Sequence, residues 1–454
     1  MKKIGEIIIS ISDWIWGAPL LILLLGGGLY FLFYSRLTPL LYFRHALKIL
    51  SGKYDDPNEP GQLRHYQALS TALAGTVGMG NVSGVALAIT MGGPGAIFWM
   101  WISALLGVST KFFTCTLAVM YRGKDSAGEI QGGPMYFITE GLGKNWKPMA
   151  IFFSIVGMIG VSPLFQANQL TQVIRDVILE PNNLGGSFQS DLITGVVISV
   201  IVGIVVIGGI KRIGNVTGRV VPFMVIIYVT TVLFIIFSNT SQIIPAFKTI
   251  LHDAFTGDAV LGGSLGAIII TGVRRAAFSN EAGLGTAPMA HGAAKTSEPV
   301  REGLVAMLGP IIDTIIICTM TALAIIITNT WINSEADGIT LTAHAFDVGI
   351  PVYGKYILTI CVSFFAMSTL FAFPYYGTKC LGFVAGAKYQ HLYNYFFVAV
   401  IIVGALSNLQ VIIGLIDISF ALMAFPTVIS ALLLSPKVRA AVIDYFARYK
   451  NQSS

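Results

Sequence analysis

Residues Gln67 to Ala88 have the sequence QALSTALAGTVGMGNVSGVALA, an apolar stretch whose middle is a poor helix former. Three glycines (Gly75, Gly78 and Gly80) fall close together there, and each costs about 1 kcal/mol relative to alanine inside a helix. The stretch has transmembrane length, and inside a membrane the backbone leaves helical bonding only where it lines an enclosed or aqueous cavity. We therefore predict a membrane helix that is broken between Gly75 and Asn81.

The composition indicates an all-α polytopic membrane protein. Of the 454 residues, 55% are hydrophobic and only 11% are charged, and the mean hydropathy is +0.76. Soluble domains contain about 25% charged residues. Apolar segments recur from end to end, so we expect one transmembrane domain over residues 1–454. The net charge of +6 lies in short loops and gives no indication of nucleic-acid binding, and the four cysteines show no CxxC spacing.

About eleven segments have the length and apolarity of membrane-spanning helices. They are expected near 14–34, 66–91, 95–121, 149–178, 190–210, 217–238, 262–292, 300–328, 352–385, 391–406 and 409–434. The first is too long for the apolar part of a signal peptide, so we expect it to be retained. Most of the 28 basic residues fall in alternate connections, which predicts an outside N-terminus and a cytoplasmic tail at 435–454.

The spans after 14–34 divide into two sets of five, at 66–238 and 262–434. Each set opens with a helix interrupted by glycine and polar residues, and we expect the second break at Thr271–Gly272. Five helices per half invert the second half, so the two broken helices would cross antiparallel at mid-membrane. This 5+5 inverted repeat with discontinuous first helices is typical of secondary transporters, which bind substrate and ion at the breaks.

The first break supplies candidate ligands of two kinds. The backbone amides around Gly78 and Gly80 suit a substrate carboxylate, because the helix after the break begins there. Oxygens suit a hard cation, and several are close by in the sequence. They are the side chains of Thr76 and Asn81 and the carbonyls of Ala74 and Val77. The alternative is a packing kink made of small residues.

Other polar residues at membrane depth extend this set. Gln166 and Asn168 either bind a substrate ammonium or hydrogen-bond another helix, and Thr271 and Gly272 are ligand candidates at the second break. A further helix carries the carbonyl of Phe365 and the hydroxyls of Ser368 and Thr369 on one face. These oxygens suit sodium, although such hydroxyls often bond their own helix.

Five charged residues lie among apolar ones and are expected to be paired or functional. They are Arg274, Arg275, Glu281, Asp313 and Asp417. We interpret the arginines and Glu281 as an internal latch for the cytoplasmic gate rather than as substrate contacts. Each aspartate is a proton carrier, a cation ligand or the partner of a buried base such as Lys111, and we favour pairing.

Three motifs resemble those of one family. Residues Gly92–Gly107 (GGPGAIFWMWISALLG), Phe165–Asn168 (FQAN) and Arg274–Pro288 (RRAAFSNEAGLGTAP) make the chain similar to the alanine/glycine:cation symporters, also called sodium:alanine symporters. The resemblance implies a leucine-transporter-like fold in the bacterial inner membrane. It also implies uptake of small neutral amino acids, alanine or glycine, with sodium as coupling ion and no organic cofactor.

The same resemblance implies roles for individual residues. It assigns the substrate to Thr76, Gly78, Gly80, Asn81 and Gln166. By analogy with the repeat fold it assigns sodium to Ala74, Val77, Phe365, Ser368 and Thr369.

Three rival functions are weighed against this one. A proton-coupled carrier would use Asp313 or Asp417 as its proton site. A channel needs symmetric pore rings, which an internal repeat does not provide. A membrane enzyme lacks support, since no HExxH or nucleophile-elbow spacing occurs. The choice between alanine and glycine, the ion stoichiometry and the oligomeric state are left open, with a monomer as the working expectation.

Overall fold

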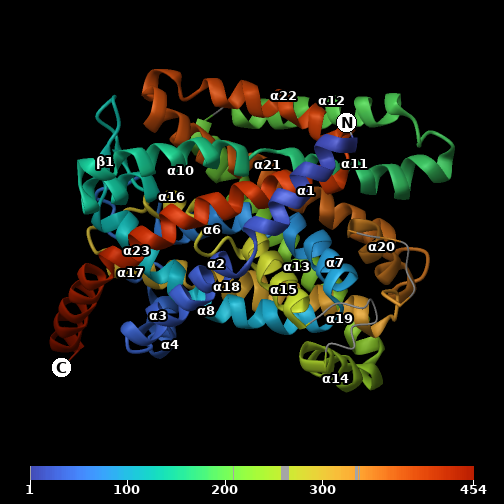
Figure 1. The fold of residues 1–454 in the computed structure, drawn as a ribbon, viewed down its shortest axis with the longest axis horizontal. Helices are drawn as coiled ribbons and strands as arrows, with labels where there is room; N and C mark the ends of the chain where they lie inside the picture. The colour runs from blue at the N-terminus through green and yellow to red at the C-terminus, as the bar shows by residue number, and fades with distance from the viewer. Residues whose placement is uncertain (1, 208, 257–264, 333–335, 337, 454) are drawn as a thin grey trace.

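The chain is almost entirely helical (Figure 1). The computed structural model describes residues 2–207, 209–256, 265–332, 336 and 338–453. Its long helices are α8 (Gly95–Met120), α10 (Lys147–Gly160), α11 (Leu164–Ile174), α12 (Phe188–Val206), α13 (Gly209–Ser238), α21 (Gly354–Ala385), α22 (Leu392–Leu406) and α23 (Leu409–Ser453).

Two broken helices and a segmented one complete the core. They are α6 (His65–Thr76) with α7 (Met79–Gly92), α15 (Leu265–Asn280) with α16 (Thr286–His291), and α17 (Pro299–Ala306), α18 (Leu308–Pro310), η6 (Ile311–Cys318) and α19 (Thr319–Ile327).

Further elements occupy the connections. They are α4 (Thr38–Leu41), α5 (Phe43–Leu50), β1 (Gly123–Lys124), β2 (Ile130–Gln131), α9 (Pro134–Tyr136), η2 (Phe137–Leu142), η3 (Lys144–Trp146), η4 (Arg175–Leu179), η5 (Glu180–Asn182), α14 (Thr240–Thr256), α20 (Gly338–Gly349) and η7 (Ala387–Tyr389). The strands β1 and β2 pair antiparallel as a small hairpin.

The expected helix at 14–34 is divided. The chain forms α1 (Lys2–Ile15), then α2 (Ala18–Leu21), η1 (Ile22–Gly26) and α3 (Gly27–Tyr34), with a bend of 47° between the two parts. Trp16 lies at the bend and donates its indole N–H to the carbonyl of Asp417 at 2.9 Å, which fixes α1 along α23.

The described residues contain eight helices that are long and apolar enough to cross a membrane, or up to ten if each of two bent pairs is one span. The expected count of about eleven is therefore not confirmed. The difference lies at 262–292, of which residues 262–264 fall outside the described part. There α15 and α16 have 16 and 6 residues and are too short for that criterion individually.

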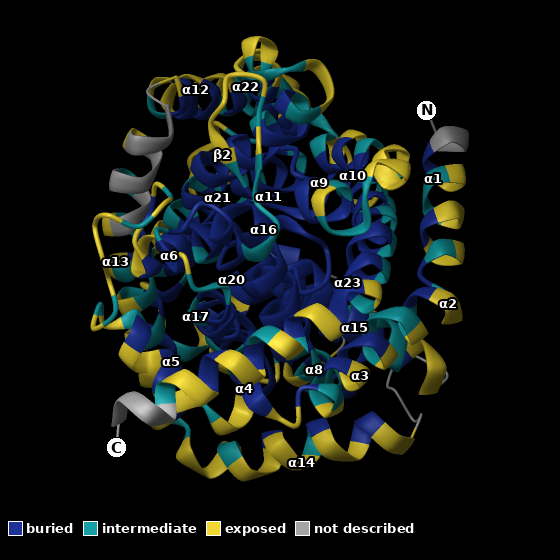
Figure 2. Cartoon of the chain, turned by 90° about the vertical axis from the view of Figure 1, so that its left-hand side faces the viewer, coloured by how far each residue is buried: buried dark blue, intermediate teal, exposed yellow. Residues whose placement is uncertain are grey.

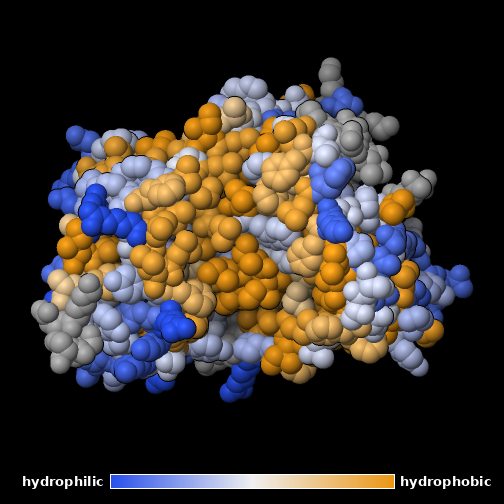
Figure 3. Space-filling model, turned by 90° about the horizontal axis from the view of Figure 1, so that it is seen from below, coloured by the Kyte–Doolittle hydropathy of each residue, from blue (hydrophilic) through white to orange (hydrophobic). Residues whose placement is uncertain are grey.

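Burial follows the expected arrangement of a membrane bundle. Figure 2 shows buried residues filling the centre around α11, α16 and α21, whereas α14 is largely exposed. Many exposed side chains are apolar, among them Val200 and Ile204 on α12 and Phe396 on α22. Figure 3 shows a broad hydrophobic surface with hydrophilic residues gathered at its sides. Such a surface is typical of a protein that faces lipid.

The expected tail at 435–454 is part of a helix, because α23 continues through it to Ser453. Its last turns pack on α5. The rings of Phe446 and Tyr42 stack with centroids 3.7 Å apart, and Tyr445 hydrogen-bonds His45 Nε2 at 2.7 Å. Arg448 binds both carboxylate oxygens of Glu298, at 2.5 and 3.1 Å. The tail is thus docked on the connections that precede α6 and α17.

We expect this docking to weaken in acid. Burial, together with the positive charges of Arg301 and Lys48, lowers the pKa of His45 to about 4. When the tail is released from α5 and His45 meets water, its pKa should return toward the ordinary value of about 6.5. Between these values the released state binds the extra proton, so docking is full above pH 6.5 and loses on the order of 2 kcal/mol as the pH falls toward 4. The distance between spin labels at the exposed Leu41 and Ala447 should lengthen over this range. The same labels in His45→Gln should show no such transition.

Candidate functional site

The first predicted break is present. Helix α6 ends at Thr76, α7 begins at Met79, and the two are bent by 41°. The backbone N–H of Gly78 donates to Asn81 Oδ1 at 2.8 Å, so the Asn81 side chain caps the first turn of α7. A Cβ at Gly78 would lie 2.5 Å from Thr369 Oγ1, so only glycine allows α21 to approach the break this closely.

Helix α21 presents its oxygens at this point of contact. The carbonyl of Phe365 accepts hydrogen bonds from Ser368 Oγ at 2.9 Å and from Thr369 Oγ1 at 3.2 Å. The hydroxyls therefore bond their own helix, the alternative that sequence analysis had left open. The structure nevertheless brings the expected ion ligands on α21 against the break, where Ala74 and Val77 are also fully buried.

The predicted position of the second break is wrong. Residues Thr271 and Gly272 lie inside α15, and a Cβ at Gly272 would meet the carbonyl oxygen of Ala96 at 2.5 Å. That glycine allows close packing against α8 instead of ending a helix, so neither residue belongs to a ligand site at a break. The break lies at 281–285, where Gly283 and Gly285 have φ of +88° and +97°. Only glycine adopts such angles readily.

A buried hydrogen-bond network joins the two breaks. Asn81 Nδ2 donates to Asp313 Oδ1 at 2.7 Å and to Ser279 Oγ at 3.2 Å. Ser279 and Thr314 each donate to Asp313 Oδ2 at 2.7 Å. The expected pair with Lys111 does not form, since no described basic group lies within 4.0 Å of this carboxylate. Asp313 thus offers a carboxylate beside the hydroxyl oxygens of Ser279 and Thr314, and hard cations prefer such oxygen ligands.

A small cavity lies between the broken helices. It measures about 10 Å³, enough for about one water molecule. Its lining includes Thr76, Gly80 and Gln166, with aromatic side chains on the other sides. The hydroxyl of Thr76 and Oε1 of Gln166 are buried and have no hydrogen-bond partner among the described residues. Such groups cost about 1–3 kcal/mol each, so the cavity is built to receive a polar ligand.

Asn168 does not join this set. Its side chain donates to the carbonyls of Gly404 at 3.2 Å and Ser407 at 2.7 Å, so it fastens α11 to the end of α22. This outcome matches the structural alternative for that residue.

The intramembrane charges are paired differently from the predicted latch. Asp417 Oδ2 lies 2.7 Å from Arg274 Nε and 2.5 Å from a terminal guanidinium nitrogen of Arg275, so its predicted pairing is confirmed. Arg274 also contacts Asp13 at 2.9 Å. These pairs join α15 to α23 and α1. Glu281 takes no part in them. It accepts a hydrogen bond from the Thr286 hydroxyl and lines the cavity.

The ends of α6 and α16 away from the breaks are tied together by residues that sequence analysis missed. Arg122 donates to the backbone carbonyls of Pro60, Gly292, Ala294 and Thr296. The two carboxylate oxygens of Glu302 bind His65 and His291, the latter at 2.5 Å. In the sequence Arg122 is one of many basic residues in the connections, and nothing marks its carbonyl partners.

On the side of the cavity opposite to Arg122 and Glu302, helix α20 covers α7 and α11. Its Thr342 hydroxyl donates to the carbonyl of Val82 at 3.3 Å, and the N–H of Ile339 donates to Gln169 Oε1 at 3.2 Å. The cavity is therefore closed on both sides, and a ligand reaches it only when one side opens.

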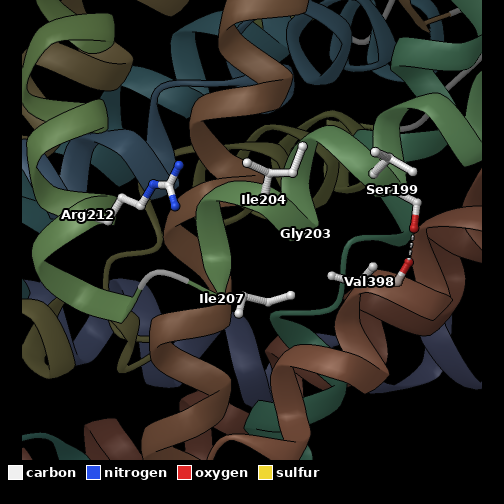
Figure 4. A pocket seen from close by; sticks show the side chains of 7 residues that line it. Ser199, Gly203, Ile204, Ile207, Arg212 and Val398 are labelled. Atoms are coloured by element: carbon white, nitrogen blue, oxygen red, sulfur yellow. Dashed lines mark hydrogen bonds between the residues drawn. The ribbon is translucent and has the colours of Figure 1, made fainter.

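Another pocket is a groove of about 530 Å³ among α12, α13 and α22 (Figure 4). Its lining is mainly aliphatic, with Arg212 at one end, and the Ser199 hydroxyl is already bonded to the carbonyl of Val398 at 2.7 Å. It lacks the converging polar groups of a specific ligand site.

Broken helices that meet at a buried polar cavity define a membrane transporter of the leucine-transporter-like class. The solved structure of MhsT with L-phenylalanine has this fold, with a TM-score of 0.50 and 10% identity, over 85% of this chain and 99% of that one. The sodium:alanine symporter family matches residues 1–454, and the chain belongs to it.

Relatives with similar sequences align with this chain over nearly their whole length. The sodium/alanine symporter AgcS of Methanococcus maripaludis is 40% identical, over 98% of each chain. An uncharacterized transporter of Haemophilus influenzae is 41% identical, over 98% of this chain and 97% of its own. The probable sodium/glutamine symporter GlnT of Bacillus subtilis is 33% identical, over 99% and 92%.

Gly78→Ala should reduce amino-acid uptake by about tenfold or more, because overpacking at the break costs about 1–3 kcal/mol. The matched control is Gly84→Ala on the same helix, where a Cβ would make only an ordinary contact of 3.8 Å with Phe278. Initial uptake rates in proteoliposomes, normalised to inserted protein, measure the effect. Equal rates for both variants would show that close contact with α21 is not needed.

Proposed function

We propose that this protein is a sodium-driven symporter that carries a small neutral amino acid, alanine or glycine, into the cell. The observation that carries the proposal is the cavity between the two breaks, with the unpartnered Thr76 hydroxyl and Gln166 Oε1. Membership in the sodium:alanine symporter family supports the ion and the substrate class.

The substrate would meet complementary groups on two sides. The start of α7, near Gly80, offers the positive end of a helix to the carboxylate. Gln166 Oε1 is an acceptor for the ammonium group, and Thr76 supplies a hydroxyl. Phe278, Phe373 and Phe420 line the cavity, so the side chain of the substrate would meet apolar rings there.

Sodium has two candidate positions. One lies where α21 meets the first break and comprises the carbonyls of Ala74, Val77 and Phe365 and the hydroxyls of Ser368 and Thr369. The other lies at Asp313, with the hydroxyls of Ser279 and Thr314 beside it. Both donor sets consist of oxygens, the atoms that sodium prefers, and the second carries a negative charge.

Transport would proceed by alternating access between the halves 66–238 and 262–434. We place the N-terminus outside and the C-terminus in the cytoplasm of a bacterial inner membrane, following the loop charges. In this orientation the contacts of Arg122 and Glu302 form the cytoplasmic closure, and release requires that they separate. A single chain contains the whole site.

Proton coupling is the second candidate, and one observation bears on it. Asp417 is neutralised by two arginines, whereas Asp313 has no basic group within 4.0 Å among the described residues. If protons drive transport, Asp313 is therefore the group that carries them.

The test is uptake of labelled alanine into proteoliposomes under an imposed sodium or proton gradient. We expect a sodium gradient alone to drive accumulation. Asn81→Ala and Asp313→Asn should each raise the sodium concentration for half-maximal uptake by about tenfold or more, the loss of one charge-assisted contact. The control Asp347→Asn removes a half-exposed carboxylate away from the cavity and should leave this value unchanged. Accumulation that needs a proton gradient and ignores sodium would reject sodium coupling.

A further inference from the structure

A second polar pocket of about 300 Å³ lies outside the site described above. It is formed by one end of α21, the start of α22 and the β1–β2 hairpin. Its lining includes Tyr375 and Lys379 from α21, Asn394 from α22, and Asp125 and Glu129 from the hairpin. Polar side chains thus converge here from three elements that are far apart in the sequence.

The pocket contains a buried lysine side chain that has no ion-pair partner among the described residues. Lys379 is 8% exposed, and its ammonium group lies over the Tyr375 ring, 4.6 Å from the centroid. No carboxylate among the described residues lies within 4.0 Å of it. Two neutral groups in the lining also lack partners, since Tyr375 Oη and Asn394 Oδ1 are buried without a hydrogen bond in the described part of the chain. A buried charge is costly unless paired, so this arrangement suits an anionic ligand.

The rim carries the opposite charge. Glu129 is exposed, and Asp125 accepts hydrogen bonds from the backbone N–H groups of Ala127 at 2.9 Å and Glu129 at 3.0 Å. The side-chain amide of Gln131 also donates to Asp125 Oδ2, at 2.9 Å. These bonds fix the hairpin beside the pocket, and Oδ2 can still accept a second hydrogen bond. A cation in the interior with two carboxylates at the rim matches a zwitterion better than a simple anion.

We propose that this pocket is a second amino-acid site, distinct from the cavity between the broken helices. The carboxylate of a small α-amino acid would pair with Lys379 and hydrogen-bond the Tyr375 hydroxyl. Its ammonium group would face Asp125 and Glu129. That the ligand is an amino acid rests on the proposed function. That the pocket suits a zwitterion rests only on the charges in its lining.

The second pocket adjoins the segments that Arg122 binds, so a ligand in it would affect transport. Gln62 also lines the pocket, and its backbone N–H donates to the carbonyl of Ala293 at 2.8 Å, within the segments that Arg122 ties together. A ligand held beside Gln62 stabilises the closed arrangement of these segments. On the orientation proposed above, amino acid accumulated in the cytoplasm would therefore slow its own further uptake.

The experiment is equilibrium dialysis of the detergent-solubilised full chain against labelled alanine, with and without sodium. We expect a sodium-dependent component from the central cavity and a sodium-independent one from the second pocket. Lys379→Gln should weaken only the sodium-independent component, by about tenfold or more, because a charge-assisted contact is lost. The control is Lys388→Gln, an exposed lysine that also lies over a tyrosine ring, at 5.7 Å, and it should bind like the parent.

A further variant covers the case in which Lys379→Gln fails to fold. Glu129→Gln changes an exposed side chain and should weaken the sodium-independent component by about threefold or more. Absence of sodium-independent binding in the parent protein, or its persistence unchanged in both variants, would overturn the proposal. Loss of the sodium-dependent component alone would reject the proposed function and still support the second site.

Discussion

The arrangement of the two broken helices depends on the hydrogen bonds of the Asn81 side chain. Its carbonyl oxygen caps α7 at Gly78, and its amide reaches Ser279 on α15 and Asp313 on η6. Asn81 therefore caps the start of α7, links α7 to α15 and orients the carboxylate of Asp313. Because every donor and acceptor involved is buried, the loss of one would leave the others unsatisfied and so distort the whole centre.

The sequence allowed a good prediction of the fold class and of the first break. The glycines at 75, 78 and 80 interrupt helical bonding directly, and the helix does bend there. The second break was misplaced because a glycine inside a helix and a glycine at its end look alike in one sequence. Gly272 serves packing against α8, whereas Gly283 and Gly285 serve the turn, and only tertiary contacts and φ angles distinguish them.

The same limit applies to the polar residues of the candidate site. Thr76, Gly80 and Gln166 line one cavity, as predicted from their chemistry. Asn168, two positions after Gln166, hydrogen-bonds α22 instead. The arginines were expected to pair with an acid, and they do, with Asp417 rather than with Glu281. Residue type identifies groups that need partners, and the packing of distant helices decides which partner each one finds.

The hydrogen bonds of Arg122 with four backbone carbonyls affect how freely the residues that supply those carbonyls can vary. Its four acceptors are backbone carbonyls, so exchanging the side chains at Pro60, Ala294 or Thr296 leaves the acceptor atoms in place. Gly61 and Gly292 are exceptions, because a Cβ would lie 2.2 Å from the carbonyl oxygen of Ala294 at Gly61 and 2.7 Å from the Cα of Gly132 at Gly292. The residues whose carbonyls Arg122 binds can therefore vary at most positions, whereas the guanidinium group of Arg122 and the carboxylate of Glu302 cannot be exchanged without loss of the contacts.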